Sequence, residues 1–397
     1  MPHPNRVFAD LPAPDAGALA HSARVADLIA GEIAAHDGFL PFHRYMDLAL
    51  YAPGLGYYVA GARKLGAAGD FITAPELSPL FARCLARQCA EVLHACDGEA
   101  LLEFGAGSGA LAAELLCELE RLDALPAQYQ ILDVSPDLRQ RQRERIASTA
   151  PHLLDRVHWI DAPPTQGFRG VMLANEVLDA LPVDVFAVRE TGLMERGVGI
   201  EDGRFVWRER EASGRLREAV ARIEQDCGPL PVGYVSEIDP NLNGWIATAS
   251  AGLERGLLLL IDYGFPRREY YHPQRHMGTL LAHYRHRALH DPLDCWPGLA
   301  DVTASVDFTA VAESGESVGL TLAGYTAQSW FLLGCGLEDV YREALEREPA
   351  SALDLAQAVQ RLTLPSEMGE RFQAIALQRG CDASLRGFAL NDARGRL

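Results

Sequence analysis

The chain has 397 residues, of which 54 are Asp or Glu and 36 are Lys or Arg, so its formal net charge is −18 at pH 7. A chain this acidic is not expected to bind nucleic acid non-specifically, because such proteins present basic surface to the phosphates, and no apolar run approaches the roughly 18 residues that a membrane span needs. The eight cysteines contain no CxxC pair and are typical of free thiols in a reducing compartment, which predicts a cytoplasmic protein.

The first 98 residues are predicted to form a helical region. Apolar spacing predicts a helix over 18–36, a second stretch starts at Phe42, and Ser78 followed by Pro79 predicts the start of an amphipathic helix over Pro79–Ala95. Residues 52–71 are rich in Gly and Tyr with little periodicity, which predicts a long ordered loop. Long loops inside compact domains are usually functional.

From residue 99 onward, short apolar runs alternate with helical stretches. This alternation is typical of a doubly wound α/β sheet with parallel strands. Helices are predicted over Ala110–Leu122 and Pro136–Ser148, with a short one over Val177–Leu181. The predicted strands are Ala100–Phe104, Tyr129–Val134, Val157–Asp161, Gly170–Asn175 and Val183–Arg189.

The second half of the sequence predicts an insertion, followed by further strands of the same sheet. A hairpin turning at Asp202–Gly203 and helices over 215–226 and 240–255 precede a buried strand, Leu257–Tyr263. We expect a closing pair of strands in Asp301–Val311 and Ser317–Leu322, then helices over 338–362 and 366–378. The chain is thereby divided into five segments: 1–98 (helical), 99–190 (Rossmann-like half), 191–256 (insertion lobe), 257–325 (returning strands) and 326–397 (C-terminal helices).

A glycine-rich turn, Glu103-Phe104-Gly105-Ala106-Gly107-Ser108-Gly109, joins a predicted strand to a predicted helix. Glycines let the chain turn sharply and let a ligand approach the backbone. Three chemistries share such a turn: a dinucleotide site (GxGxxG/A), a degenerate nucleophile elbow around Ser108, and the S-adenosylmethionine (SAM) turn of Rossmann-like methyltransferases. In the last of these, the acid that precedes the glycines approaches the amino group of the methionine part.

Polar residues at the ends of the predicted strands favour the third interpretation. Glu103 at the end of an apolar strand needs a partner, which a cationic ligand supplies. Asp133 ends the second predicted strand, where an acid can hold ribose hydroxyls. Asp161 ends the third strand, where an adenine edge can be held. Asn175 and Glu176 lie at the end of the fourth strand. A dinucleotide enzyme, a hydrolase and a binding-only Rossmann domain remain alternatives from these residues alone.

Several blocks of the sequence resemble the MidA-type SAM-dependent methyltransferases, a family that includes a mitochondrial complex I assembly factor with protein arginine methyltransferase activity. The blocks run from about residue 45 to 310. They are GDFITAPELS (69–78), LLEFGAGSG (101–109), NEVLDALPV (175–183), IDYG (261–264), HMGTLLAHYRHRALHDPL (276–293) and DVTASVDF (301–308).

The resemblance implies a seven-stranded methyltransferase sheet, a helical N-terminal region and an inserted substrate-facing lobe. It further implies SAM as cofactor and methyl transfer to a protein arginine, with a complex I (NADH-quinone oxidoreductase) subunit as the candidate substrate. A non-catalytic assembly factor that keeps the SAM-binding fold, or a dinucleotide-binding oxidoreductase, is the alternative. No nucleic acid partner or membrane insertion is expected, and a homodimer is considered.

An arginine substrate sets the requirements for the catalytic residues. A guanidinium stays protonated at neutral pH, so carboxylates must hold its planar fork and accept a proton. Glu176 is the first candidate, because it follows the fourth strand at the crevice, and Asp179 lies three residues later on the same predicted turn. The alternatives are a cofactor contact for Glu176 and a surface charge for Asp179.

Two further groups of residues are candidates. Asp70 and Glu76, with Thr73 and Pro75 shaping the turn, lie on a loop that we expect to fold over the cofactor and exclude water; the alternative is a structural loop. Segment 272–290 holds five histidines, but no cysteine pair or HExxH accompanies them, so no metal is predicted. Its arginines make it basic, and we expect it to contact an acidic face of a partner. Cofactor contacts are predicted for Glu103, Gly105, Gly107, Gly109, Asp133, Asp161, Asn175, Thr73 and Pro75.

Overall fold

The computed structural model describes residues 11–60 and 73–397, which form two compact units. The first unit takes its described residues from Met1–Phe71, Asp179–Asn241 and Phe265–Ser305. The second takes them from Ile72–Leu178, Leu242–Gly264 and Val306–Leu397. The chain therefore passes between the units several times, and the five segments expected from the sequence stay a prediction.

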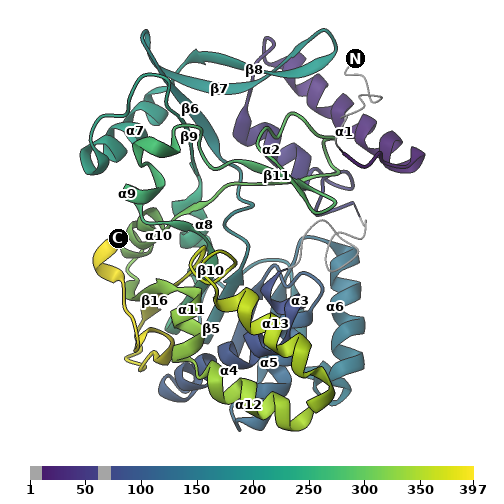
Figure 1. Cartoon of the computed structure of the whole chain (residues 1–397), viewed down its shortest axis with the longest axis vertical. Helices are drawn as coiled ribbons and strands as arrows, with labels where there is room; N and C mark the ends of the chain where they lie inside the picture. Colours follow the sequence, from purple (N-terminus) through teal and green to yellow (C-terminus); the bar gives the residue numbers. More distant parts are fainter. Residues whose placement is uncertain (1–10, 61–72) are drawn as a thin grey trace. The chain divides into compact units, whose positions relative to one another are not determined.

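A mixed sheet forms the centre of the second unit (Figure 1). Its strand order is β15-β16-β10-β5-β2-β3-β4, with the short β14 (Val306–Asp307) on β10. Every pair from β10 to β4 is parallel, whereas β16 is antiparallel to both of its neighbours. The predicted α/β class is confirmed, and seven strands follow one another across the sheet, with the two-residue β14 as an eighth at its side. The strands are β2 Ala100–Phe104, β3 Gln128–Leu132, β4 Val157–Ile160, β5 Phe168–Asn175, β10 Leu253–Phe265, β15 Thr321–Ala327 and β16 Phe372–Arg379.

Helices cover both faces of this sheet. On one face, Leu101, Leu173 and Leu259 share a buried cluster with α4 (Pro79–Ala95), α5 (Ala110–Arg121), α12 (Leu337–Arg347) and α13 (Ala352–Thr363). On the other, Trp245 of α8 (Leu242–Ala249) packs on Phe104 with ring centroids 5.5 Å apart. Strands buried on both faces read as continuous apolar runs, as in the predicted Leu257–Tyr263 strand. The remaining helices of this unit are α3 Ala74–Leu77, α6 Pro136–Thr149, α10 Phe308–Ser317 and α11 Gln328–Gly334.

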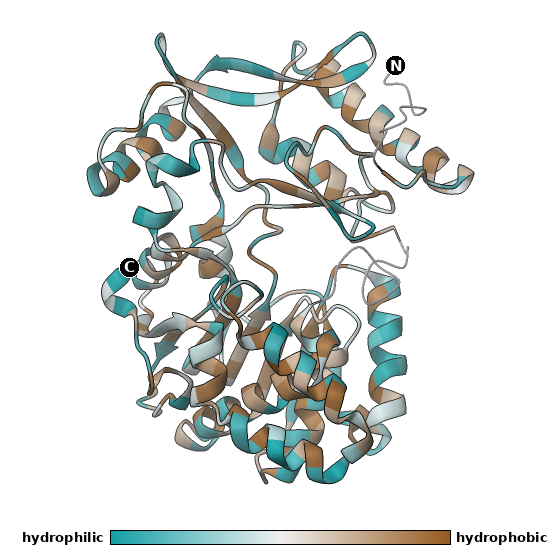
Figure 2. Cartoon of the chain, viewed as in Figure 1, coloured by the Kyte–Doolittle hydropathy of each residue, from teal (hydrophilic) through white to brown (hydrophobic). Residues whose placement is uncertain are grey.

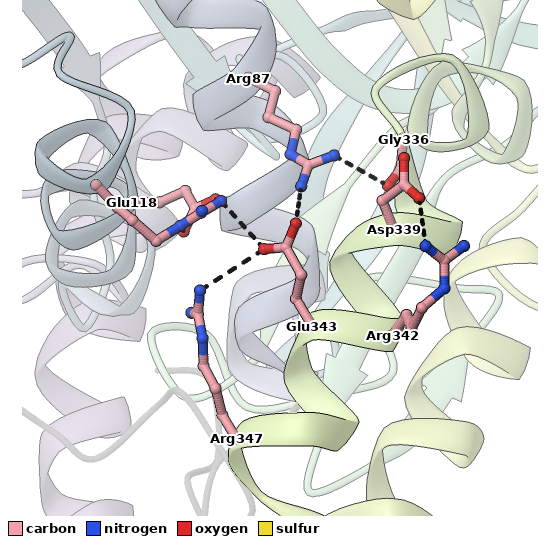
Figure 3. Close-up of polar contacts among 8 residues, drawn as sticks. Arg87, Glu118, Gly336, Asp339, Arg342, Glu343 and Arg347 are labelled. Carbon is pink, nitrogen blue, oxygen red and sulfur yellow. Dashed lines mark hydrogen bonds and ion pairs between the residues drawn. The ribbon is translucent and has the colours of Figure 1, made fainter.

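An ion-pair network fastens α12 to α4 and α5 (Figure 3). The Glu343 carboxylate lies 2.8 Å from Arg87 Nη2 and 3.1 Å from Arg121 Nη2. Arg121 also pairs with Glu118, whose side chain is almost fully buried. The Arg87 side chain is only 11% exposed. If the Glu343 carboxylate were removed, little water could reach the Arg87 guanidinium to take its place.

Glu343→Gln is therefore expected to lower the free energy of unfolding by about 1 to 2 kcal/mol, the range for a partly buried hydrogen bond to a charged group. Denaturant titration followed by circular dichroism measures the shift. Asp339→Asn is the matched control, because the Asp339–Arg342 pair on the same helix is exposed at both ends and should matter by less than about 0.5 kcal/mol. Equal midpoints for the two variants would contradict a tethering role for Glu343.

The first unit contains two antiparallel sheets. The larger has the order β1-β7-β6-β9, with β8 on β7, and the smaller has the order β12-β11-β13. The predicted hairpin at Asp202–Gly203 is present between β7 and β8. Helices α1 (Ala16–Ala35) and α2 (Phe42–Tyr51) pack on these sheets, while α7 (Gly214–Cys227) and α9 (Arg267–Tyr270) enclose a second core. The strands are β1 Leu40–Pro41, β6 Asp184–Arg189, β7 Gly192–Glu201, β8 Arg204–Glu211, β9 Val235–Ile238, β11 Leu281–Tyr284, β12 Arg287–Leu289 and β13 Asp301–Thr303.

Two predictions around the fourth parallel strand are wrong. Residues 177–181 form turns rather than a helix, because a buried carboxylate takes their amide hydrogens, as described below. The strand predicted at Val183–Arg189 exists as β6, but it pairs antiparallel with β7 and β9 in the first unit. A parallel connection needs a crossover of a dozen or more residues, and only a short turn separates β5 from β6.

Two predictions near the C-terminal end are also wrong. The expected strand Asp301–Val311 is broken, because Asp307 accepts the amide hydrogens of Thr309 (3.0 Å) and Ala310 (3.2 Å) and starts α10. The expected helix over 366–378 is instead β16, which lies between β10 and β15. A short apolar run such as Ala374–Leu377 does not separate a buried strand from a buried helix by periodicity. In the part of the chain that the structure describes, no helix is long and apolar enough to cross a membrane.

Candidate functional site

The glycine turn lies in the second unit between β2 and α5. Gly105, Gly107 and Gly109 all have positive φ (64°, 53° and 81°), a region that side chains disfavour. A Cβ on Gly109 would also lie 2.9 Å from the Cα of Gln142 on α6. The backbone of the turn that leads into α5 therefore carries few side chains, and unpaired amide groups at a helix start attract electron-rich ligand groups.

Glu103 lies at the end of β2 directly before this turn. Its side chain is 3% exposed, and Oε2 accepts a hydrogen bond of 2.5 Å from the Tyr129 hydroxyl on β3. Burial raises the pKa of Glu103 to about 7, although the Tyr129 hydrogen bond opposes the shift. Among the described residues no cation pairs with this carboxyl, so the site suits a positively charged ligand group.

Asp133 follows the end of β3, where the sequence predicted a ribose contact. It is buried, and burial raises the pKa of its carboxyl. Oδ1 accepts the amide hydrogen of Ser135 (2.9 Å), and Oδ2 accepts a hydrogen bond from Gln142 Nε2 (2.8 Å). Val134, next to it, is 60% exposed and offers apolar surface beside the acid.

Asp161 follows β4 and is 91% exposed at its side chain. Arg139 of α6 holds it through Nη1 at 2.7 Å and donates from Nε to the carbonyl of Asp133 at 2.8 Å. Arg139 therefore links the ends of β3 and β4. The structure brings Asp161 and Asp133 to the same edge of the sheet, as the sequence predicted.

The loop before α4 touches the glycine turn. Thr73 is the N-cap residue of α3, Pro75 lies in its first turn, and Glu76 accepts a hydrogen bond from the Ser108 hydroxyl. This contact brings Glu76 to the edge of the predicted cofactor site. Asp70, predicted on the same loop, lies outside the described residues.

Glu176 follows the end of β5 with φ of 54°, although it carries a long side chain. Its amide donates to the Ile261 carbonyl at 2.9 Å, and Asn175 Nδ2 donates to its Oε1 at 3.1 Å. Buried Asp262 of β10 fixes the turn, because Oδ2 accepts the amide hydrogens of Val177 (3.2 Å) and Leu178 (2.9 Å).

This turn adjoins the glycine turn, since a Cβ on Gly105 would lie 3.1 Å from the Val177 side chain. A non-glycine residue in the left-handed region costs roughly 1–3 kcal/mol and persists where the surroundings enforce it, as at functional sites. Glu176, the first candidate for the catalytic base, has this left-handed backbone conformation. The Oδ1 atom of Asn175 is buried without a hydrogen-bond partner among the described residues, so it is free to accept from a ligand.

Residues 177–181 form no helix, so the helical face that Glu176 and Asp179 were expected to share is not formed. Asp179 belongs to the first unit. Its carbonyl accepts the amide hydrogen of Ala304 at 2.9 Å. Nearby, the Tyr58 hydroxyl donates to both carboxylate oxygens of Asp301 at 2.9 Å. Burial raises the pKa of Tyr58 well above its ordinary value, and Asp301 and Asp179 add to the shift. Asp179 therefore lies in an acidic, aromatic part of the first unit.

The predicted basic segment, 272–290, belongs to the first unit, and some of its side chains contact other residues of that unit. Arg275 stacks on Phe265 and donates from Nε to the Glu269 carbonyl at 2.9 Å. The hairpin turn at Arg285 and His286 has positive φ at both residues and is exposed. Among the described residues, no group of three or more His, Cys, Asp or Glu is placed to hold a metal ion.

Three residues of the site were missed from the sequence: Gln142, Arg139 and Asp262. Gln142 had a signal, because it sits four residues after Leu138 and four before Ile146, in the buried stripe of α6. Asp262 also had one, as a charge inside a buried apolar strand. Arg139 lies on a helix with many charges, and nothing in the sequence singles it out.

The comparisons with known proteins agree with this geometry. The family described as "Putative S-adenosyl-L-methionine-dependent methyltransferase" matches residues 84–326, so the chain belongs to this family of SAM-dependent methyltransferases. Its predicted enzyme class and cofactor are thereby confirmed. The chain is similar over 98% of its length to a likely methyl transferase from Burkholderia thailandensis bound to S-adenosyl-homocysteine, with 46% identity, a TM-score of 0.93 and 100% of that chain covered.

More distant relatives carry a more particular name. The zebrafish "Protein arginine methyltransferase NDUFAF7, mitochondrial" is 31% identical over 83% of this chain and 81% of its own length. The human protein of the same name is 28% identical over 84% of this chain and 78% of its own length. The predicted resemblance to the MidA-type family is confirmed by these matches.

One prediction is corrected by the same relatives. The free cysteines led us to expect a cytoplasmic protein, but the relatives named above are mitochondrial proteins. Free thiols indicate a reducing environment, and the cytoplasm is only one such place. The cytoplasmic assignment is therefore wrong.

Proposed function

We propose that this chain methylates the guanidinium group of an arginine on a protein substrate, with SAM as methyl donor. The observation that carries the proposal is the backbone of Glu176, which Asp262 and the Ile261 carbonyl hold in a left-handed turn at the carboxyl end of β5. Ligands bind at this edge of open α/β sheets. The names of the relatives support arginine as the acceptor.

The residues around the glycine turn fit SAM. When bound, SAM supplies an electrophilic methyl group on a sulfonium. We assign Glu103 to the positively charged amino end, the bare turn at Gly105, Gly107 and Gly109 to the methionine part, and Asp133 to the ribose hydroxyls. Asp161 and Val134, after β4 and β3, are assigned to the adenine side. The buried Oδ1 of Asn175, at the end of β5 on the other side of β2, is assigned to the methionine part.

Glu176 is assigned to the substrate. Its carboxylate would hold the guanidinium by paired hydrogen bonds, leave one nitrogen aimed at the methyl group, and accept the proton that this nitrogen loses as the N–C bond forms and the S–C bond breaks. Glu76 of the short helix α3, whose carboxylate accepts a hydrogen bond from Ser108, would hold the start of this helix, with Thr73 and Pro75, beside the site and exclude water. The predicted catalytic roles of Asp70 and Asp179 stay predictions.

A subunit of respiratory complex I is the candidate substrate that the family resemblance implies. The exposed turn at Arg285, His286 and Arg287 is the candidate contact with an acidic face of that partner. A homodimer remains a further proposal for the assembled enzyme.

The proposal is tested by incubating the purified chain with complex I subunits and SAM that carries a deuterated methyl group. Peptide mass spectrometry should find the label on arginine. Glu176→Gln is the matched control, since it keeps the size of the side chain and removes the base. Label on another residue type would refute arginine as acceptor, and cofactor binding without any transfer would favour a non-catalytic assembly factor.

A further inference from the structure

The buried stripe of helix α6 contains a glutamine. Figure 2 shows that α6 is hydrophilic over most of its length, and its buried residues are Leu138, Gln142 and Ile146. Gln142 is fully buried. A buried primary amide that lacks hydrogen-bond partners destabilises the folded state, whereas a leucine at this position would carry no such penalty. The amide is therefore kept for what it contacts.

Both ends of the Gln142 amide are hydrogen-bonded. Nε2 donates to Asp133 Oδ2 at 2.8 Å and to the Gly107 carbonyl at 3.0 Å. Oε1 accepts from the Trp159 indole N–H of β4 at 2.9 Å. The Trp159 bond orients the amide, because only its oxygen can face the indole donor and its nitrogen must then face Asp133 and Gly107.

The contact with Gly109 adds a second constraint. The Cα of Gln142 would lie 2.9 Å from a Cβ on Gly109, so α6 packs so closely on the start of α5 that any residue with a Cβ at position 109 would force a shift. One residue thus meets the acid, the glycine turn and the neighbouring strand, all within the second unit. Moving Gln142 would move the acid and the turn relative to each other.

We propose that Gln142 is a positioning residue that fixes Asp133 and the Gly107 carbonyl in register for the ribose and methionine parts of the cofactor. The inference rests on the assignment of Asp133 under the proposed function. A carboxylate has about four lone-pair sites. The Ser135 amide and Gln142 each use one, on different oxygens, so each oxygen keeps a site for a ribose hydroxyl.

Calorimetry with two ligands tests the proposal without any methyl transfer. The ligands are S-adenosylhomocysteine and its analogue that lacks both ribose hydroxyls. Wild type should bind the analogue at least tenfold more weakly. Gln142→Met keeps the side-chain volume and removes the amide donors. Its affinity should fall about tenfold for S-adenosylhomocysteine and less than threefold for the analogue.

Gln140→Met is the matched control on the exposed side of the same helix and should bind both ligands like wild type. Trp159→Phe is the second variant in case Gln142→Met fails to fold. It removes the indole N–H that orients Gln142 and keeps an aromatic ring beneath Arg143. A several-fold loss of affinity for S-adenosylhomocysteine alone is expected. Equal losses for both ligands in either variant would overturn the positioning role. Equal affinity of wild type for the two ligands would also overturn the positioning role, because Asp133 would then not bind the ribose hydroxyls. If the chain failed to methylate protein, these binding results would still hold.

Discussion

Glu176→Gln is expected to reduce methyl transfer at least about a thousandfold while it leaves the affinity for SAM within about threefold. A positioned general base contributes roughly 10²–10⁴ in rate, and the amide also cannot form the charged fork with a guanidinium. Single-turnover methylation and calorimetry measure the two quantities separately. A parallel loss of SAM affinity and methylation would move Glu176 to the cofactor contacts.

The backbone at Glu176 gives this prediction a second readout. A left-handed conformation costs a non-glycine residue about 1–2 kcal/mol, while glycine loses about 0.5–1 kcal/mol through its greater freedom in the unfolded chain. Glu176→Gly, which relieves φ of 54°, should therefore keep the free energy of unfolding or raise it by up to about 1 kcal/mol, and still abolish methylation.

Glu218→Gly is the matched control for stability. Glu218 is exposed on α7, where glycine should lower the free energy of unfolding by about 1 kcal/mol. If Glu176→Gly lowers stability as much as this control, the turn at Glu176 stores no strain. A more stable but inactive Glu176→Gly would show that the strained residue is kept for its side chain and not for the stability of the fold.

The sheet of the second unit could be predicted because its signals are local. The apolar runs at Ala100–Phe104 and Leu257–Tyr263 are long enough to place strands, and the glycine turn between β2 and α5 is specified by residues that follow each other in the chain. The acids at strand ends could be placed for the same reason, since the carboxyl ends of parallel strands meet at one edge.

The remaining errors arise from contacts between residues far apart in sequence. The turn after Glu176 is set by Asp262, 84 residues from Leu178, and this contact replaces the helix that propensity favoured. Asp179 and Glu176 are neighbours in sequence but belong to different units, which no local pattern indicates. Gln142 was missed because a polar residue in a charged helix looks exposed until its partners, Asp133 and Trp159, are known.

Binding of SAM below pH 7 is expected to release a proton from Glu103. Burial raises the pKa of this carboxyl to about 7 in the ligand-free protein, so it is mostly protonated at pH 6 and mostly ionised at pH 8. A cationic ligand group beside it favours the carboxylate. Proton release should therefore approach one per SAM at pH 6 and approach zero at pH 8, and affinity should fall up to about tenfold per pH unit below 7.

Calorimetry in buffers of different ionisation enthalpy measures the released protons. Tyr129→Phe is the matched variant, because the Tyr129 hydroxyl bond lowers the pKa of Glu103; without it the pKa rises, and proton release should persist to higher pH. Glu103→Gln should bind SAM at least tenfold more weakly at pH 8 and lose the buffer dependence. Unchanged proton release in Glu103→Gln would assign the titration to another group.

The same carboxyl links stability to pH in the absence of SAM. A carboxyl whose pKa is raised on folding binds more protons in the native state, so its contribution is favourable at low pH and is lost as pH rises from 4.5 to 7. The loss is at most about 3 kcal/mol. Ligand-free Glu103→Gln should therefore be more stable than wild type at pH 8 and no more stable at pH 4.5. Ionised Glu103 lowers the stability of the ligand-free protein, and the positive charge of the cofactor would offset this loss. Such a residue is expected in a binding site rather than in a purely structural core.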